Sequence, residues 1–206
     1  HKTLLAYERR GVSRRYSHYA LPRNCDTVFF PGCALAGARP DATRQLFEQL
    51  GKEIPNLGIV LDCCTKPSHD LGRRAHFESV FGEMTAYLSA QGIKTVLVAC
   101  PNCFKIFRHH GNGIAVKTVY EVIHAAGGVS GTHNGGREVS VHDPCALRNE
   151  PPVQRAVRGL LSSMGLTVAE MKHRGRHTVC CGEGGMVGFV KPELAKEWSA
   201  IRGRDS

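Results

Sequence analysis

Short apolar runs alternate with longer amphipathic segments along the first part of the chain. The runs have the length of buried strands, and the segments between them carry apolar residues at the spacing of a helix that covers one face. Strands that alternate with helices indicate a parallel sheet with flanking helices. The pattern therefore predicts an α/β fold. The predicted strands are 27–30, 58–61 and 95–99, and the predicted helices are 41–51, 73–90 and 116–126.

The same order of elements begins again after a segment rich in glycine. Residues 127–137 combine glycine with small polar residues and predict a flexible linker. A second series follows, with a strand at 138–142, a helix at 153–164 and an apolar run at 166–171. We therefore expect two pseudo-symmetric modules, each a small parallel sheet with flanking helices. The expected parts are a basic lead-in at 1–26, a first module at 27–126, the linker at 127–137 and a second module at 138–206.

The strongest chemical signal is the set of nine cysteines. Their number is odd, and the basic first residues lack the apolar core of a secretory signal, so a disulfide framework is not expected. Two pairs are adjacent in sequence, and a disulfide between neighbours would strain the peptide that joins them. These features point to metal binding or thiol chemistry.

Eight of the nine cysteines form an internal repeat. Each copy has a Cys-Ala-Leu shortly after a proline and then an adjacent Cys-Cys pair, and the first copy ends in a Cys-x-x-Cys. A matching Cys-x-x-Cys would fall beyond Ser206, so we expect the second module to be cut short. The cysteines of the first copy are Cys33, Cys63, Cys64, Cys100 and Cys103. Those of the second copy are Cys145, Cys180 and Cys181. Cys25 fits neither copy and is interpreted as a structural residue.

The cysteines of the first copy follow predicted strands directly. The carboxyl ends of parallel strands meet at one edge of a sheet, so these side chains can converge although they are far apart in sequence. Thiolates are soft ligands that favour zinc or iron–sulfur clusters. A structural zinc takes four ligands, so one of the five cysteines would have no role in binding it. A cluster of several irons can use the fifth thiolate as a bridge between two irons. The residues alone leave both cofactors open.

These motifs resemble the cysteine-rich CCG modules of the B subunit of heterodisulfide reductase and of related subunits of glycerol-3-phosphate, lactate and glycolate oxidation systems. The resemblance covers about residues 27–206 and is carried by both Cys-Cys pairs, the single cysteines before them and Cys100-Pro101-Asn102-Cys103. It implies that the eight cysteines are cofactor and metal ligands. The implied cofactor is a [4Fe–4S] cluster, which is noncubane in heterodisulfide reductase, with zinc as the alternative.

The resemblance also implies a role. The chain would be an iron–sulfur electron-transfer subunit of an oxidoreductase complex, with flavin- or ferredoxin-type partner subunits and a quinone or the membrane as a further partner. Its expected location is the cytoplasm or the membrane periphery. Two alternatives stay open: a thiol/disulfide reductase that acts directly at a cluster, and a zinc-stabilised interaction module. Whether the chain is itself an enzyme is left open.

Some features depart from the family pattern. Thr65 follows the first pair where the motif has glycine, which leaves the cluster type of the first module open. No ferredoxin-type Cys-x-x-Cys-x-x-Cys run is present in the sequence, so cubane relay clusters are expected elsewhere.

His142 and His177 each precede a cysteine by three residues and are candidate hydrogen-bond donors to sulfur, and Asp143 is expected to shape a turn.

Charge and hydropathy narrow the partners further. The formal net charge is +9, and basic residues cluster in the lead-in and again at 172–176. Such clusters favour an acidic partner or an anionic surface. Aromatic residues make up 7% of the chain and are not interleaved with the basic ones, so nucleic acid is not an expected partner. No apolar stretch reaches the roughly 18 residues that a membrane-spanning helix requires.

Overall fold

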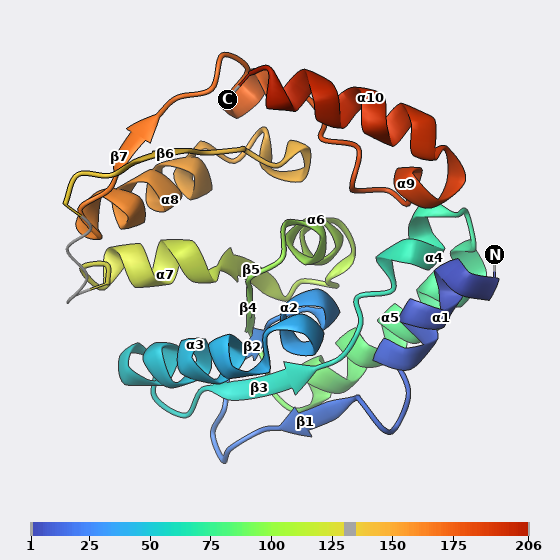
Figure 1. The fold of residues 1–206 in the computed structure, drawn as a ribbon. Coiled ribbons are helices and arrows are strands. Elements are labelled where there is room, and N and C mark those ends of the chain that lie inside the picture. Colours follow the sequence, from blue (N-terminus) through green and yellow to red (C-terminus); the bar gives the residue numbers. More distant parts are fainter. Residues whose placement is uncertain (1, 130–134, 206) are drawn as a thin grey trace. The chain divides into compact units, whose positions relative to one another are not determined.

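The computed structural model describes residues 2–129 and 135–205, which form two compact units that divide between Val119 and Tyr120 (Figure 1). Both units combine helices with strands, and the α/β class expected from the sequence is confirmed. The pseudo-symmetry of two modules and their boundaries stay predictions. Part of the expected linker, residues 130–134, lies outside the described residues.

Unit 1 is built on a five-stranded sheet with the order β1-β3-β2-β4-β5. The last four of these strands run parallel, and β1 joins the edge antiparallel to β3. In the register, Val28 faces Gly58 on one side and Val96 on the other. The strands are β1 (His18–Ala20), β2 (Thr27–Phe30), β3 (Gly58–Leu61), β4 (Thr95–Val98) and β5 (Ala115–Thr118).

Helices connect these parallel strands, as crossover geometry requires. Helices α3 and α5 correspond to the predicted helices 41–51 and 73–90 with small changes of boundary. Helix α6 was not predicted, although Pro101 at its first turn is a helix-start signal. The helices of this unit are α1 (Lys2–Gly11), α2 (Cys33–Ala38), α3 (Pro40–Glu53), α4 (Lys66–Asp70), α5 (Arg74–Ala90) and α6 (Pro101–His110).

The predicted helix 116–126 is wrong in its first residues. Residues 115–118 form β5, and α7 (Val119–Ala125) begins only after it. The reason is tertiary: β5 pairs with the edge of β4 from Ala115 to Thr118, which satisfies its backbone groups as a strand.

The basic lead-in is part of unit 1. It forms α1 and the edge strand β1, which pairs with β3 from His18 to Ala20. Figure 1 shows α1 (blue) beside α4 (teal), and the two helices are in contact. The side chain of Glu8 on α1 is buried, with 1% of its surface exposed. Residues 2–20 are therefore an integral part of unit 1 and not a separate segment before it.

The core of unit 1 lies around the two central strands. Phe29 and Phe30 of β2 and Leu97 of β4 are buried, and because neighbouring strand residues point to opposite faces, Phe29 and Phe30 fill the core on both sides of the sheet. The ring of Phe107 on α6 meets Phe30 edge to face, with ring centres 5.2 Å apart. Each such side chain contributes about 1.5–3 kcal/mol by leaving water. This packing holds the carboxyl ends of β2, β3 and β4 in place.

Unit 2 contains a two-stranded parallel sheet, in which β6 (Glu138–Ser140) pairs with β7 (Thr167–Ala169). Helix α8 (Pro151–Ser163) connects them, and its Leu160 is buried. Both strands are shorter than the predicted runs 138–142 and 166–171. The remaining elements are the 3₁₀ turns η1 (Cys145–Leu147) and η2 (Gly175–His177) and helices α9 (Val187–Val190) and α10 (Pro192–Gly203).

Candidate metal centre

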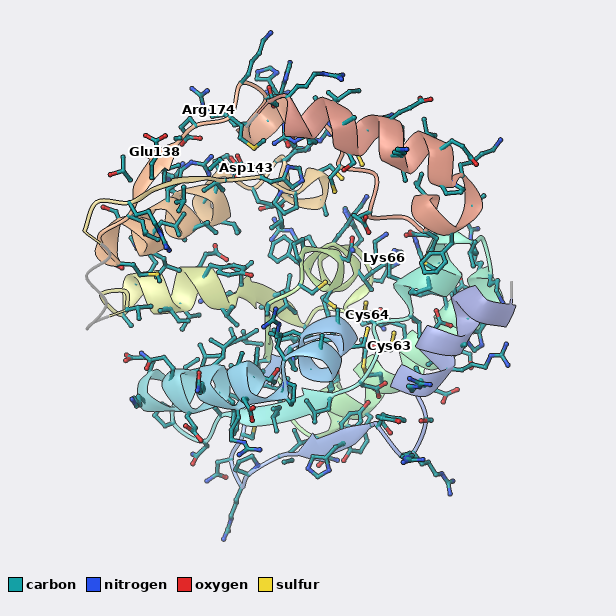
Figure 2. All side chains as sticks on the ribbon, viewed as in Figure 1. Cys63, Cys64, Lys66, Glu138, Asp143 and Arg174 are labelled. Carbon is teal, nitrogen blue, oxygen red and sulfur yellow. The ribbon has the colours of Figure 1, made fainter. Side chains whose placement is uncertain are left out.

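The structure brings the five cysteines of the first copy together at the carboxyl edge of the sheet. Cys33 opens α2 after β2, the Cys63-Cys64 pair follows β3, and Cys100 and Cys103 begin α6 after β4. Figure 2 shows the pair on the segment that leaves β3. The cysteines lie together because each follows a parallel strand, and the carboxyl ends of these strands share one edge of the sheet.

Hydrogen bonds join these thiols into one continuous series. The Sγ atoms of Cys33 and Cys63 are 4.0 Å apart, and those of Cys64 and Cys103 are 3.5 Å apart. Cys63 in turn bonds to Cys64, and Cys103 to Cys100. The resulting order is Cys33, Cys63, Cys64, Cys103, Cys100. Among the described residues, no group of three or more His, Cys, Asp or Glu side chains is arranged around a single ion.

Two glycines allow the backbone to approach these sulfurs closely. Gly32 has a φ of +79°, and a Cβ there would lie 3.1 Å from Cys103 Sγ. Gly11, at the end of α1, packs against the pair so tightly that a Cβ would lie 2.9 Å from Cys63 Cβ. Any larger residue at either place would have to displace a cysteine. The lead-in helix therefore contributes to the cysteine cluster directly.

Two of the five thiols are poised to be thiolates at neutral pH. Hydrogen bonds donated by Cys103 and then by Cys63 lower the pKa of Cys64 to about 5. The hydrogen bond from Cys103 also lowers the pKa of Cys100 to about 6, and the N–H groups of Cys103 and Asn102 at the start of α6 act in the same direction. Thiolate is the form that binds metal, so these two residues could bind a metal without first losing a proton.

The donors in this series are correspondingly reluctant to ionise. The pKa of Cys103 is raised well above its ordinary value because its hydrogen bonds with Cys100 and Cys64, and its burial, favour the protonated thiol. For Cys63, the hydrogen bond from Cys33 lowers the pKa, but the bond to Cys64 together with burial raises it overall. Metal binding would release these protons.

Thr65, directly after the pair, has an unusual backbone and an unpaired hydroxyl. Its φ is +50°, in the left-handed region, and its side chain is fully buried. Its Oγ1 atom is buried without a hydrogen-bond partner among the described residues. A soft five-thiol donor set, close glycine backbone and an unpartnered donor beside the pair together fit an iron–sulfur cluster.

We expect Thr65→Gly to raise the free energy of unfolding of the metal-free chain by about 1 kcal/mol. Relief of left-handed strain is worth about 1–2 kcal/mol and loss of an unpaired buried hydroxyl about 1–3 kcal/mol. The entropy of glycine opposes this by about 0.5–1 kcal/mol, and the lost methyl group by about 0.8 kcal/mol. Urea unfolding measures the sum. Thr65→Val, which removes the hydroxyl alone, is the matched control, and a less stable glycine variant would contradict the argument.

The cysteines of the second copy also lie together in unit 2. Cys145 begins η1, and burial and then the charge of Cys180 raise its pKa. Cys145 and Cys180 share a hydrogen bond, and Cys181 interacts electrostatically with Cys145. Gly182 follows the pair with a φ of +84°, and a Cβ there would lie 2.7 Å from the carbonyl oxygen of Ala195. Unit 2 thus requires the glycine that Thr65 replaces in unit 1.

A buried carboxylate fixes the cysteine-bearing segments of unit 2. Asp143 accepts two 2.9 Å hydrogen bonds from the guanidinium of Arg158 and one of 2.7 Å from the N–H of Gly175. Its carbonyl oxygen accepts a hydrogen bond from Thr178 Oγ1 at 2.6 Å. Asp143 thereby ties the turn before Cys145 to the segment before Cys180. The sequence indicated only its turn-shaping role.

Asp143→Asn is expected to destabilise unit 2 by about 2 kcal/mol at pH 7. This is less than the loss of a fully buried ion pair would cost, because Arg158 is partly exposed and retains its ion pair with Glu170. Burial alone would raise the pKa of Asp143, but the bonds from Arg158 and Gly175 outweigh it and hold that pKa below its usual range. The stabilisation is therefore present above the unfolded pKa of about 3.9 and is lost as pH falls through the lower folded pKa.

The measurement is the free energy of unfolding from pH 7 down to pH 3. The asparagine variant should lose less stability over the acid range than the wild type. Glu170→Gln, which removes the half-exposed partner of the same arginine, should cost under about 1 kcal/mol. Parallel curves for wild type and Asp143→Asn would refute the assignment.

Cys25 stands apart from both groups. Its thiol is buried and donates a 3.2 Å hydrogen bond to the carbonyl oxygen of Thr27. Its Sγ lies close to Gly58, where a Cβ would come within 2.9 Å. These contacts agree with a packing role between β2 and β3. No sequence pattern indicates a role for Glu8 or Gly11, because the segment that carries them has no cysteine and predicts only a basic lead-in.

Five thiols at the carboxyl edge of a mostly parallel sheet, with three more in a second α/β unit, define a cysteine-rich metal-binding class of protein. The comparison with protein families agrees. The chain belongs to the cysteine-rich domain family CCG, whose family model matches residues 27–108 and 139–202. The resemblance to CCG modules is thereby confirmed.

Three curated relatives of the chain are named as redox enzymes or as subunits of them. The D subunit of dihydromethanophenazine:CoB–CoM heterodisulfide reductase from Methanosarcina barkeri is 30% identical over 88% of this chain and 48% of its own length. The B subunit of fumarate reductase (CoM/CoB) from Methanothermobacter marburgensis is 27% identical over 82% of this chain and 35% of its own length. EtfAB:quinone oxidoreductase of Syntrophomonas wolfei is 23% identical over 77% of this chain and 24% of its own length. The chain thus spans less than half the length of these relatives.

Among solved structures, a dienelactone hydrolase from Anabaena variabilis covers 90% of both chains, with 15% sequence identity and a TM-score of 0.34. A likeness this low carries no inference about fold or activity.

Proposed function

We propose that the chain is an iron–sulfur electron-transfer part of an oxidoreductase complex. Its main centre would be held in unit 1 by Cys33, Cys63, Cys64, Cys100 and Cys103. The observation that carries this proposal is the continuous series of five thiols, two of them with strongly lowered pKa values. Membership of the CCG family and the redox relatives support it.

The residues of unit 1 would act as follows. Cys64 and Cys100 would bind iron as preformed thiolates, and the others would bind after losing their protons. A [4Fe–4S] cluster, when bound, would supply one-electron exchange. The N–H groups at the start of α6 and the hydroxyl of Thr65 would donate to sulfur, which raises the reduction potential. Gly11 and α1 would keep water away from Cys63.

Unit 2 would hold part of a second centre. It offers Cys145, Cys180 and Cys181, together with the close backbone at Gly182. Three thiolates leave one coordination position for another donor, which is the pattern of an incomplete centre.

The partners follow from charge and from the relatives. We propose that the chain works with flavin- or ferredoxin-type subunits, because its relatives are named as subunits or as quinone oxidoreductases. The exposed arginines of the lead-in would face an acidic protein surface or anionic lipid. The proposed location is the cytoplasm or the membrane periphery. No helix formed by residues 2–129 or 135–205 is long and apolar enough to cross a membrane.

A second candidate function is thiol/disulfide reduction directly at the centre. It is favoured by a cavity that opens onto Cys33, because such chemistry needs a cysteine or iron within reach of a small molecule. A zinc-stabilised module is the third, and the five-thiol series speaks for a larger centre than one tetrahedral ion.

The test is iron, zinc and sulfide analysis of chain purified without oxygen, with absorption and paramagnetic resonance spectra. About four irons and four sulfides would support one cluster in unit 1, and about eight of each a second one in unit 2. About one zinc without sulfide would overturn the electron-transfer proposal.

A further inference from the structure

A cavity of about 630 Å³ reaches the cysteine series at one point. Of the five thiols, Cys33 is the one that lines it. The end of α1 and the following turn line it with Arg10, Gly11 and Tyr16, and α2 lines another part of it. This volume lies within the range of about 300–1,000 Å³ that is typical of small-molecule sites.

Small side chains make the space. Apart from Cys33, the residues of α2 that line the cavity are alanines and a glycine, and the end of β3 contributes Leu61. A Cβ added at Gly37 would meet nothing within 4 Å, so the space beside this helix is open. The walls are largely apolar and suit a short carbon chain.

The charged groups that line the cavity are not equivalent. Asp62 is engaged within the protein, because Oδ2 accepts a 2.5 Å hydrogen bond from Tyr19 and Oδ1 a 2.7 Å bond from the N–H of Cys63. Arg10 makes no side-chain hydrogen bond or ion pair with the described residues. The unsatisfied charge of the cavity is therefore positive.

This positive wall belongs to the lead-in. Arg10, Gly11 and Tyr16 precede residue 27, where the match to the CCG family begins. The wall is thus a feature that the family match does not cover. Glu8, one turn before Gly11, holds it in place through two hydrogen bonds to Ser68 on α4.

We propose that this cavity binds a small organic anion, with its anionic group at Arg10 and a short apolar chain along α2 towards Cys33. The inference deepens the proposed function and rests on it for its redox meaning, since the ligand would lie beside the proposed centre. Binding itself needs only the fold of unit 1. The ligand class is a compound with a single carboxylate or similar group and a short aliphatic part.

The test compares two alkylating reagents of similar size, anionic iodoacetate and neutral iodoacetamide, on the reduced, metal-free full chain. Mass spectrometry measures the rate at Cys33, and each rate is divided by that of a small free thiol. We expect the iodoacetate-to-iodoacetamide ratio at Cys33 to be about three- to tenfold higher than for the free thiol, because a nearby cation in a partly screened site attracts the anion.

Three variants make the test specific. Arg10→Gln should bring the ratio close to that of the free thiol, whereas Arg9→Gln, an exposed neighbour outside the cavity, should leave it high. Gly37→Leu should slow both reagents at Cys33 by filling the open space. Sodium propionate should protect Cys33 from iodoacetate better than inorganic phosphate does, because its ethyl group can contact the apolar wall.

Equal ratios in the wild type and Arg10→Gln would overturn the anion site, and stronger protection by phosphate would overturn the organic part. Both results are independent of metal content. If the protein contains no iron but Cys33 still prefers iodoacetate, the anion site stands and the proposed electron-transfer function fails. If the protein contains iron but Cys33 shows no preference for iodoacetate, the proposed function stands and the anion site fails.

Discussion

Cys64→Ser should lower the iron and sulfide content of the unit 1 centre, in chain purified without oxygen, by at least about tenfold. Loss of a residue that only hydrogen-bonds to a metal ligand already lowers metal affinity by about 10–100-fold, and Cys64 would be a ligand itself. Cys64 is the thiol most strongly prepared for binding, with a pKa of about 5 and hydrogen bonds from both Cys63 and Cys103. Serine keeps the size of the side chain, but its hydroxyl stays protonated at neutral pH and is a harder donor than thiolate. Iron analysis and the visible spectrum measure the loss.

Cys25→Ser is the matched control. Cys25 is a buried thiol of the same unit, but it bonds to the carbonyl oxygen of Thr27 and lies outside the series of five. We expect this variant to keep its iron while losing roughly 1 kcal/mol of stability, because a small buried apolar group is replaced by a polar one. Equal iron content in the two serine variants would contradict the placement of the centre.

Glu8→Gln should destabilise unit 1 by about 2–3 kcal/mol and expose Cys63. Glu8 accepts hydrogen bonds of 2.7 Å and 2.6 Å from the N–H and hydroxyl of Ser68, and His76 Nε2 lies 3.2 Å away. An amide can accept only at its oxygen, so one buried donor would lose its partner, and hydrogen bonds to charged groups are worth about 1.5–3 kcal/mol. Urea unfolding measures the loss of stability.

A second readout separates the position of α1 from general destabilisation. Because Gly11 packs on Cys63, release of α1 should raise the alkylation rate of Cys63 under conditions where the chain remains folded. Glu48→Gln, an exposed change on α3, should alter neither stability by more than about 0.5 kcal/mol nor the alkylation rate. An unchanged rate at Cys63 in Glu8→Gln would mean that this carboxylate does not hold α1 over the cysteines.

Local patterns predicted the parallel strands well. The runs 27–30 and 58–61 match β2 and β3 residue for residue, because a buried strand between two helices must be apolar on both faces. The run at 95–99 matches β4 to within one residue. Residues 115–118 were assigned wrongly because a run this short carries no period that distinguishes a strand from the first turn of a helix.

The grouping of the five cysteines of the first copy followed from their places after strands, since topology alone brings such positions to one edge of the sheet. Which of them become thiolates did not follow. That depends on which thiol donates to which: Cys103 donates to Cys64 at 3.5 Å, and this direction is a property of packed side chains. No sequence pattern records such a direction.

The contributions of the lead-in belong wholly to the folded chain. Glu8 meets Ser68 across 60 positions of sequence, Gly11 meets Cys63, and Arg10 faces the cavity at Cys33. Residue identity and periodicity act over a few positions, so they revealed the strands, the repeat and the class of metal ligand. Burial, proton placement and the shape of a cavity arise only when distant segments exclude water from one another, and these the tertiary structure alone established.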